Sequence, residues 1–469
     1  MTKIKFGTDG WRAIIAREFT VENVAKVTIA ASRWLLKKYK NPSVVIGYDC
    51  RFGGKMFSET VAKVFAHSGI KVYFSTSFVP TPAVSLAISF LEANMGVVIT
   101  ASHNPPDYNG YKLKGSHGGP LMEDQTREIE AMIPEELEIL IDSLKWDDLV
   151  AKGFIIETDV EKIYIDHLKN NFDIKALKKS KFKFAFEAMY GAGQDVMRKL
   201  MPDIELFHCD YNPSFKGIAP EPLEKNLKEF QNAIATGKKI DCGLAVDGDA
   251  DRIALFDKHG NYIDSHNIIL LLIYYLAGFK KQTGSIVTGF SSTSKVEQLA
   301  WKYGLEVKRV RIGFKDICKI MLEEDVLVGG EESGGIAIRG HIPERDGIWM
   351  GLTLWTFMME TGKNIDELLQ EVHNITGNFS YTRIDLKVDE NVKKDVLNRC
   401  KNNNITSFGK YKVDHLETLD GFKYFLNESE WLMIRPSGTE PLLRLYAEAE
   451  TPEKVADILK KALDFVNKK

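Results

Sequence analysis

Three aspartates at alternate positions, Asp247, Asp249 and Asp251, are followed directly by Arg252. Because small residues fill the gaps, the three carboxylates can turn toward one hard cation, and without a cation their charges would repel one another. No glutamate stands at the twelfth position of a calcium-binding loop, and so few protein oxygens leave room for water and a phosphate oxygen, which favours Mg²⁺. A solvated acidic turn is the alternative, and metal binding is the preferred interpretation.

Ser102 offers a hydroxyl nucleophile in the segment Thr100-Ala101-Ser102-His103-Asn104-Pro105, directly after an apolar run that is typical of a strand. Open α/β sheets bind ligands at the carboxyl ends of their strands, so a serine at this place is positioned to react. Taken alone, the segment is more typical of an ordinary Ser/Asn turn.

Two glycine-rich loops add groups that could recognise a phosphorylated sugar. The segment 329–335, GGEESGG, lets the backbone approach a ligand, and its Glu331 and Ser333 can hydrogen-bond to hydroxyls. The segment 435–440, RPSGTE, combines an arginine, two hydroxyls and a free backbone N–H in a compact anion nest. Each loop alone could equally be a surface turn or a capped turn. No GxxxxGK[ST] motif is present, which excludes a nucleotide P-loop.

Together the four loops supply a nucleophile, a hard metal, a polyol-binding group and a phosphate clamp. Alternating strand-like and helix-like segments lead up to the first of these loops: strands at 43–48, 70–74 and 96–100, and helices at 55–67 and 81–91. This order predicts a mostly parallel sheet covered by helices. The same pattern returns twice, with strands at 182–186, 242–246, 286–289 and 326–329. A helix with Thr451 as its N-cap and Pro452 at its first position ends the chain.

These elements predict an α/β fold with three similar α/β domains, whose sheets are mixed but mostly parallel, and a C-terminal α+β domain. We expect the four domains to surround a central cleft that gathers the loops. The predicted ranges are 1–148 with the serine loop, 149–253 with the aspartates, 254–374 with the sugar loop and 375–469 with the phosphate loop.

Composition narrows the class of protein further. A net charge of −3 provides no global basic field for nucleic acid and no polybasic surface for membranes. The five cysteines form no CxxC pair, which argues against a disulfide framework and against a structural zinc site. The N-terminal segment lacks the apolar core of a signal peptide, and the longest apolar run, 268–279, is too short to span a bilayer. We therefore expect a cytoplasmic protein.

Five segments in order, FGTDGWR, TASHNPPDYNGYK, DGDADR, GGEESGG and RPSGTEP, resemble the α-D-phosphohexomutase superfamily of phosphoglucomutases, phosphomannomutases and phosphoglucosamine mutases. The match runs from Phe6 to about Glu448, nearly the whole chain. The resemblance implies a heart-shaped fold of four domains and a phosphoserine at Ser102.

The resemblance also assigns roles to individual residues. It implies that Mg²⁺ is held by Asp247, Asp249, Asp251 and a phosphoserine oxygen of Ser102. The residues implied around the reacting phosphoryl group are Arg12, His103, Lys112 and Arg252. The residues implied to bind the substrate are Gly313, Lys315, Glu331, Ser333, Arg345, Arg435, Ser437, Gly438 and Thr439, and the last four would grip the phosphate that is not transferred.

The implied reaction interconverts hexose 1-phosphates and hexose 6-phosphates. Phospho-Ser102 gives its phosphoryl group to the free hydroxyl, the bisphosphate turns over, and its other phosphoryl group returns to Ser102. A hexose 1,6-bisphosphate would therefore act as activator. Lys112 or His103 would accept the hydroxyl proton, and Lys112 is preferred because the positive charges of Mg²⁺ and a nearby arginine would lower its pKa.

Gly335 bears on the sugar, because many phosphomannomutases and phosphoglucosamine mutases carry a histidine at that place. The glycine is more similar to phosphoglucomutases and favours glucose phosphates. The alternatives are a phosphomannomutase or phosphoglucosamine mutase, a phosphatase or phosphotransferase that uses an aspartyl phosphate at Asp247, and a catalytically silent sugar-phosphate sensor. Oligomeric state and pathway have no signature in the sequence.

Overall fold

The computed structural model describes residues 4–237, 239–402, 404–436 and 442–467. The chain divides into two compact units, residues 1–268 with 313–368, and residues 269–312 with 369–469. Each unit carries its own sheets and core. Within the described ranges, no helix combines the length and the apolar character needed to cross a membrane.

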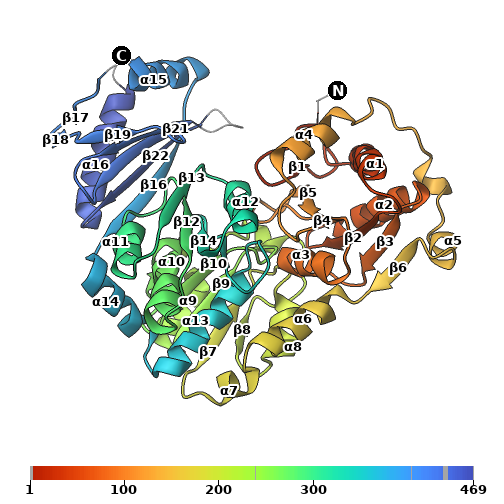
Figure 1. Cartoon of the computed structure of the whole chain (residues 1–469), viewed down its shortest axis with the longest axis horizontal. Coiled ribbons are helices and arrows are strands. Elements are labelled where there is room, and N and C mark those ends of the chain that lie inside the picture. The colour runs from red at the N-terminus through yellow and green to blue at the C-terminus, as the bar shows by residue number, and fades with distance from the viewer. Residues whose placement is uncertain (1–3, 238, 403, 437–441, 468–469) are drawn as a thin grey trace. The chain divides into compact units, whose positions relative to one another are not determined.

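The first unit begins with a six-stranded sheet in the order β1-β5-β4-β2-β3-β6 (Figure 1). Strands β2, β3, β4 and β6 run parallel. At one edge β5 pairs antiparallel with β4, and β1 pairs antiparallel with β5. The strands are β1 (Trp11–Ile14), β2 (Ser43–Tyr48), β3 (Lys71–Ser75), β4 (Met95–Ile99), β5 (Tyr108–Gly115) and β6 (Ile155–Thr158). The main helices are α1 (Val21–Lys38), α2 (Gly54–His67), α3 (Thr81–Phe90), α4 (Glu123–Ala131), α5 (Trp146–Ala151) and α6 (Val160–Asn171).

The parallel strands of this sheet are apolar on both faces, which explains why helices cover both of them. Val44 and Ile46 of β2 belong to the same core cluster as apolar residues of α1 and α2. On the opposite face α3 approaches so closely that a Cβ on Gly96 would lie 2.3 Å from Ile88 Cδ1. The absence of a side chain at Gly96 therefore lets α3 lie against the strands. Thr81 is the first residue of α3.

A second sheet of the first unit has the order β11-β10-β9-β7-β8. Strands β8, β7 and β9 are parallel, and β10 returns antiparallel to β9 across the loop that holds the three aspartates. The strands are β7 (Phe184–Glu187), β8 (Glu205–Phe207), β9 (Cys242–Val246), β10 (Ile253–Asp257) and β11 (Tyr262–Ile263), and the nearby helices are α7 (Ile174–Lys179), α8 (Gln194–Leu200) and α9 (Lys228–Thr236). The sheet thus continues past the boundary expected after residue 253, because β10 pairs with β9 along its whole length.

The first unit also contains an antiparallel hairpin of β14 (Val326–Gly330) and β15 (Ile336–Ile338), together with α12 (Phe314–Glu323) and α13 (Gly347–Thr361). The sugar loop predicted at 329–335 connects the two strands of this hairpin. Asp346 caps α13 by accepting a hydrogen bond from Trp349 N at 2.9 Å, which fixes the segment before the helix.

The second unit combines a parallel pair, β12 (Ser285–Gly289) and β13 (Val307–Val310), with a five-stranded antiparallel sheet in the order β16-β22-β21-β20-β19. The sheet strands are β16 (Ser380–Lys387), β19 (His415–Glu417), β20 (Phe422–Phe425), β21 (Trp431–Pro436) and β22 (Leu442–Ala449), with a small hairpin of β17 (Ser407–Phe408) and β18 (Tyr411–Lys412). The helices are α11 (Lys295–Lys302), α15 (Glu390–Asn402) and α16 (Pro452–Asn467). The residues of α10 (Ser265–Ile273) and of α14 (Ile365–Thr376) are divided between the two units.

Most sequence predictions of these elements agree with the structure. Three α/β segments with mixed, mostly parallel pairing precede an antiparallel α+β segment, as predicted. Thr451 caps α16 through its Oγ1, which accepts a hydrogen bond from Lys454 N at 3.3 Å, as predicted. The other expected boundaries, after residues 148 and 374, stay predictions.

Candidate active site

Ser102 lies at the carboxyl end of β4, where its backbone takes the left-handed conformation with φ +52°. This conformation is uncommon for a residue with a side chain. It turns the hydroxyl of Ser102 toward the loop of residues 247–252 that carries the three aspartates, called the acidic loop below. Ser102 Oγ donates to Asp247 Oδ2 at 2.6 Å and lies 3.2 Å from His103 Nδ1. Ser102 is 1% exposed. The predicted nucleophile and the predicted metal ligands are therefore in direct contact.

The three aspartates converge as their spacing predicts. All three are buried, and one carboxylate oxygen of each lies within 4.8 Å of the others. Asp249 Oδ1 and Asp251 Oδ1 are buried and accept no hydrogen bond from any described residue. Buried carboxylate oxygens that lack a donor are costly unless a cation binds them, so the donor set fits a hard divalent ion such as Mg²⁺. Burial and the charges of Asp251 and Asp249 raise the pKa of Asp247.

Lys112, on β5, is enclosed by carboxylates. Its Nζ lies 2.8 Å from Asp9 Oδ2, 2.8 Å from Asp249 Oδ2 and 3.0 Å from Asp251 Oδ2. Burial acts to lower the pKa of Lys112, but these three carboxylates raise it overall. The lowered pKa expected for Lys112 beside a bound Mg²⁺ and an arginine stays a prediction, and the three carboxylates, Asp9 among them, act in the opposite direction.

His103 has the opposite electrostatic surroundings. Burial, followed by the positive charges of Arg252 and Arg12, lowers the pKa of His103 well below its ordinary value. The imidazole is thus neutral at physiological pH and can accept a proton beside Ser102 Oγ.

Arg345 and Asp9 connect the serine loop, the acidic loop and the start of α13. Arg345 Nη2 lies 2.6 Å from Asp9 Oδ2 and 2.8 Å from Asp251 Oδ2. Arg12, on β1, donates from Nη1 to Asn104 Oδ1 at 2.7 Å and places Nη2 3.6 Å from Asp9. Asp9 therefore pairs with Lys112, Arg345 and Arg12 at once.

Arg252 links the acidic loop to the sugar loop. Its backbone forms an isolated antiparallel bridge with Gly335, and its Nη1 lies 3.3 Å from Glu221 Oε1. Glu331 is 5% exposed, and burial raises its pKa to about 7. Ser333 is half-buried in the same loop. A Cβ on Gly335 would lie 2.3 Å from Arg345 Cδ, so the arginine stem occupies the place that a side chain would need.

Gly313 and Lys315 begin α12 in the same unit. Gly313 has φ +135°, and a Cβ there would lie 2.8 Å from Thr8 Cγ2, which brings this turn against the segment before β1. Burial lowers the pKa of Lys315. Both residues belong to the same unit as Ser102 and the aspartates.

The phosphate loop belongs to the second unit. Arg435, on β21, places Nη2 3.1 Å from Asp420 Oδ2. Ser437, Gly438 and Thr439 lie outside the described residues.

Sequence reasoning missed several polar residues that contact the site. Asp9 was named only within the FGTDGWR segment, and that segment was the signal that could have found it. Thr81 donates from Oγ1 to Asp249 Oδ2 at 2.5 Å, and Lys114 pairs with the buried Glu344. Neither Thr81 nor Glu344 stands in a motif whose spacing indicates chemistry.

Comparison with known proteins gives one consistent result. Four profiles of the phosphoglucomutase/phosphomannomutase family match: α/β/α domain I at residues 3–139, domain II at 162–260, domain III at 264–375, and the C-terminal domain at 384–464.

Two relatives and one solved structure extend the likeness over the whole chain. A phosphoglucomutase/phosphomannomutase of Thermococcus kodakarensis is 30% identical, with 97% of this chain and 96% of the relative covered. A phosphoglucosamine/phosphogalactosamine mutase of Sulfurisphaera tokodaii is 31% identical, with 97% of each covered. The crystal structure of a putative phosphomannomutase from Thermus thermophilus superimposes with a TM-score of 0.86 at 32% identity and covers all of both chains.

Proposed function

The chain belongs to the phosphoglucomutase/phosphomannomutase family of α-D-phosphohexomutases, and we propose that it interconverts glucose 1-phosphate and glucose 6-phosphate through a phosphoserine at Ser102. The observation that carries the assignment of Ser102 is the 2.6 Å contact between its hydroxyl and Asp247. A serine held against three buried carboxylates is placed where a divalent cation can neutralise the phosphoryl group that it carries.

In the proposed first step, the free hydroxyl oxygen of the hexose monophosphate attacks phosphorus, and the bond from phosphorus to Ser102 Oγ breaks. The hydroxyl proton leaves to a base, Ser102 Oγ takes up a proton as it leaves phosphorus, and the product is a hexose 1,6-bisphosphate. After the sugar turns over, Ser102 Oγ attacks the other phosphoryl group, and the second hydroxyl regains a proton. Positioning and charge neutralisation dominate the barrier of such transfers.

Asp247, Asp249, Asp251 and a phosphoserine oxygen would hold Mg²⁺, which would supply charge neutralisation on the phosphoryl oxygens. Arg12 and Arg252 add positive charge on the protein side. We assign acceptance of the Ser102 hydroxyl proton, in the step in which Oγ attacks, to His103, whose Nδ1 lies 3.2 Å from that oxygen. Lys112 is not assigned as the base, because its Nζ is bound by three carboxylates. Lys112 then serves to hold the acidic loop and Asp9 in place.

The remaining site residues are proposed to bind the substrate. Glu331 and Ser333 contact sugar hydroxyls, and Gly313, Lys315 and Arg345 help to hold the substrate. Arg435, with Ser437, Gly438 and Thr439, binds the phosphate that is not transferred. One anion clamp serves both orientations of the sugar because it recognises only that phosphate.

The preference for glucose rests on Gly335, where the stem of Arg345 leaves no space for a side chain. A phosphoglucosamine mutase is the second candidate, since a relative of that kind is 31% identical. The test is a panel of glucose, mannose and glucosamine phosphates, assayed with catalytic glucose 1,6-bisphosphate and Mg²⁺.

We expect the highest kcat/KM for glucose 1-phosphate, measurable turnover of mannose 1-phosphate, and reversible loss of both on chelation of the metal. A strong preference for glucosamine 6-phosphate would reassign the substrate, and no turnover of any hexose phosphate would contradict the proposed function.

A further inference from the structure

Arg51 follows the carboxyl end of β2 and is fully buried within the first unit. A buried guanidinium is costly unless its N–H groups are satisfied. Its terminal nitrogens donate to the backbone of the serine loop: Nη2 to the carbonyls of Ser102 and Asn104, both at 2.6 Å, and Nη1 to the carbonyls of Pro105 at 2.8 Å and Tyr108 at 3.1 Å. One side chain thus holds four carbonyls of the segment that presents the nucleophile.

Asp49 provides a second connection between β2 and the same loop. Its Oδ2 accepts from Thr100 Oγ1 at 2.5 Å, and Thr100 Oγ1 accepts from Ser102 N at 2.8 Å. Asp49 Oδ2 also lies 3.3 Å from Arg51 Nε, and Asp49 Oδ1 accepts from Arg51 N at 2.9 Å. Asp49 and Arg51 therefore act on both ends of the turn, through the N–H and through the C=O of Ser102.

The conformation of Ser102 explains why the loop needs such restraint. A left-handed φ is unfavourable for a residue with a side chain, so this backbone persists only where its surroundings hold it. All four hydrogen bonds from Arg51 to the loop are accepted by backbone carbonyl oxygens. None of the four residues that accept them is proposed to bind the sugar.

We propose that Arg51 is a positioning residue for phosphoryl transfer, which keeps Ser102 Oγ directed at Asp247 by holding the backbone of residues 102–108. The inference rests on the proposed role of Ser102 as the phosphoryl carrier. It predicts a loss in kcat with little change in KM, because displacement of a reacting atom by about 1 Å can cost roughly 10²-fold in rate.

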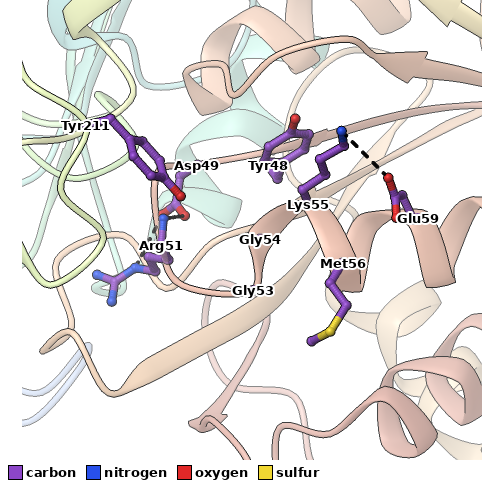
Figure 2. A pocket seen from close by; sticks show the side chains of 9 residues that line it. All are labelled: Tyr48, Asp49, Arg51, Gly53, Gly54, Lys55, Met56, Glu59 and Tyr211. Atoms are coloured by element: carbon purple, nitrogen blue, oxygen red, sulfur yellow. Dashed lines mark hydrogen bonds and ion pairs between the residues drawn. The ribbon is translucent and has the colours of Figure 1, made fainter.

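A cavity beside Arg51 makes a chemical rescue experiment possible. Asp49 and Arg51 line a space of about 460 Å³ together with Tyr48, Met56 and Tyr211. Figure 2 shows Asp49 and Arg51 side by side at this pocket, with Tyr211 nearby. Truncation to alanine would join the volume of the guanidinium to this cavity, so that free guanidinium can enter and donate to the same carbonyls.

The experiment compares Arg51→Ala and Arg51→Lys with wild type and with Arg399→Ala. Arg399 is a matched control, because it donates to the carbonyls of Phe465 and Val466 and pairs with Asp395 at 2.9 Å, far along the chain in α15. The readouts are kcat and KM for hexose 1-phosphate, and the fraction of Ser102 phosphorylated by glucose 1,6-bisphosphate, each with and without guanidinium well below the unfolding transition.

We expect both Arg51 variants to lose about 10²-fold in kcat while KM stays near the wild-type value. Guanidinium should restore part of kcat in Arg51→Ala, ammonium should not, and Arg399→Ala should keep wild-type kcat. Arg51→Lys keeps the charge beside Asp49 but cannot reach four carbonyls, so it carries the test if the alanine variant fails to fold.

Two results would overturn the inference. One is an unchanged kcat in a folded Arg51 variant. The other is a loss of kcat that guanidinium does not restore and that matches the loss of folded protein, and in either case a phosphorylated, active wild type would still support the proposed function. A wild type that carries no phosphate on Ser102 would contradict the proposed function itself and this inference with it.

Discussion

Lys112 and His103 show how a charge state depends on contacts that are distant in the sequence. The carboxylates that bind Lys112 Nζ come from the turn before β1 and from the acidic loop, which are far apart in the chain. A lysine that neutralises three carboxylates is a poor proton acceptor, because it is already protonated. His103 is flanked by arginines and is neutral, which is the state that a base requires.

The proton assignment predicts a change in the pH profile. Because the pKa of His103 is lowered below 6.5, protonation of the imidazole should make kcat/KM of the wild type decline in the acidic range below that value. His103→Gln should lower kcat/KM by roughly 10²–10⁴-fold and remove this acidic decline.

Lys112→Met is the matched comparison for that profile and should keep the decline, although activity falls. Glu331, whose pKa is raised to about 7, contributes a separate step near pH 7 that both variants retain. Steady-state rates of both variants and of the wild type, measured across the acidic and neutral pH range, identify which residue is the base. If the decline persists in His103→Gln and disappears in Lys112→Met, the base is Lys112.

Residue patterns predicted the core of the site better than its surroundings. The spacing of Asp247, Asp249 and Asp251 correctly indicated convergent carboxylates, since a local loop brings them together. Thr81 contacts the same loop directly, and Asp9 is linked to it through Lys112 and Arg345. Both come from elements far away in the sequence, so the spacing within the aspartate loop does not indicate them. Long-range partners of a site need the fold before they can be identified.

At the scale of elements, apolar runs bounded by turn residues predicted several strands with their limits. Strands 43–48 and 242–246 have the predicted limits, because both are almost entirely buried and read as continuous apolar runs. The boundary expected after residue 253 was placed at the DGDADR segment, although the chain turns there and pairs β10 with β9. The sequence of β9 contains no feature that indicates whether the next strand pairs with it.

Strand β20 carries an ionisable side chain that nothing in the sequence sets apart. Lys423 is 2% exposed, donates to the carbonyl of Phe290 at 3.1 Å and lies 4.0 Å from the Trp431 ring. Burial lowers the pKa of Lys423 to about 7, against 10.5 for the ordinary side chain. Between these values the unfolded chain binds a proton that the folded chain does not, so stability should rise with pH across this range.

Replacement of Lys423 tests that linkage. Relative to wild type, Lys423→Met should gain most in free energy of unfolding near the lowered pKa of the lysine, and the gain should shrink by on the order of 4 kcal/mol as the pH approaches the ordinary lysine value. Lys412→Met, at an exposed position of β18, is the control and should show no such trend. Denaturant unfolding of the full chain at several pH values measures the difference, and a pH-independent difference for Lys423→Met would refute the linkage.

For the whole molecule, the fold class predicted from alternating segments agrees with the four matched domain profiles. The compact units divide the chain differently, since residues 269–312 group with the C-terminal sheet. Contacts such as Ser294 Oγ with Glu448 Oε1 at 2.6 Å explain this grouping. Such contacts form between segments far apart in sequence, so the order of elements cannot predict them.

The central claim for the whole molecule is that one phosphoryl group passes through Ser102. The direct measurement is intact mass and peptide mapping of the protein after incubation with glucose 1,6-bisphosphate, and again after addition of excess hexose 1-phosphate. One phosphoryl group should map to Ser102, resist hydroxylamine, and leave on addition of the monophosphate with stoichiometric formation of bisphosphate. Ser102→Ala should lose both adduct and activity. A hydroxylamine-sensitive phosphate at Asp247, or full activity of Ser102→Ala, would contradict the account.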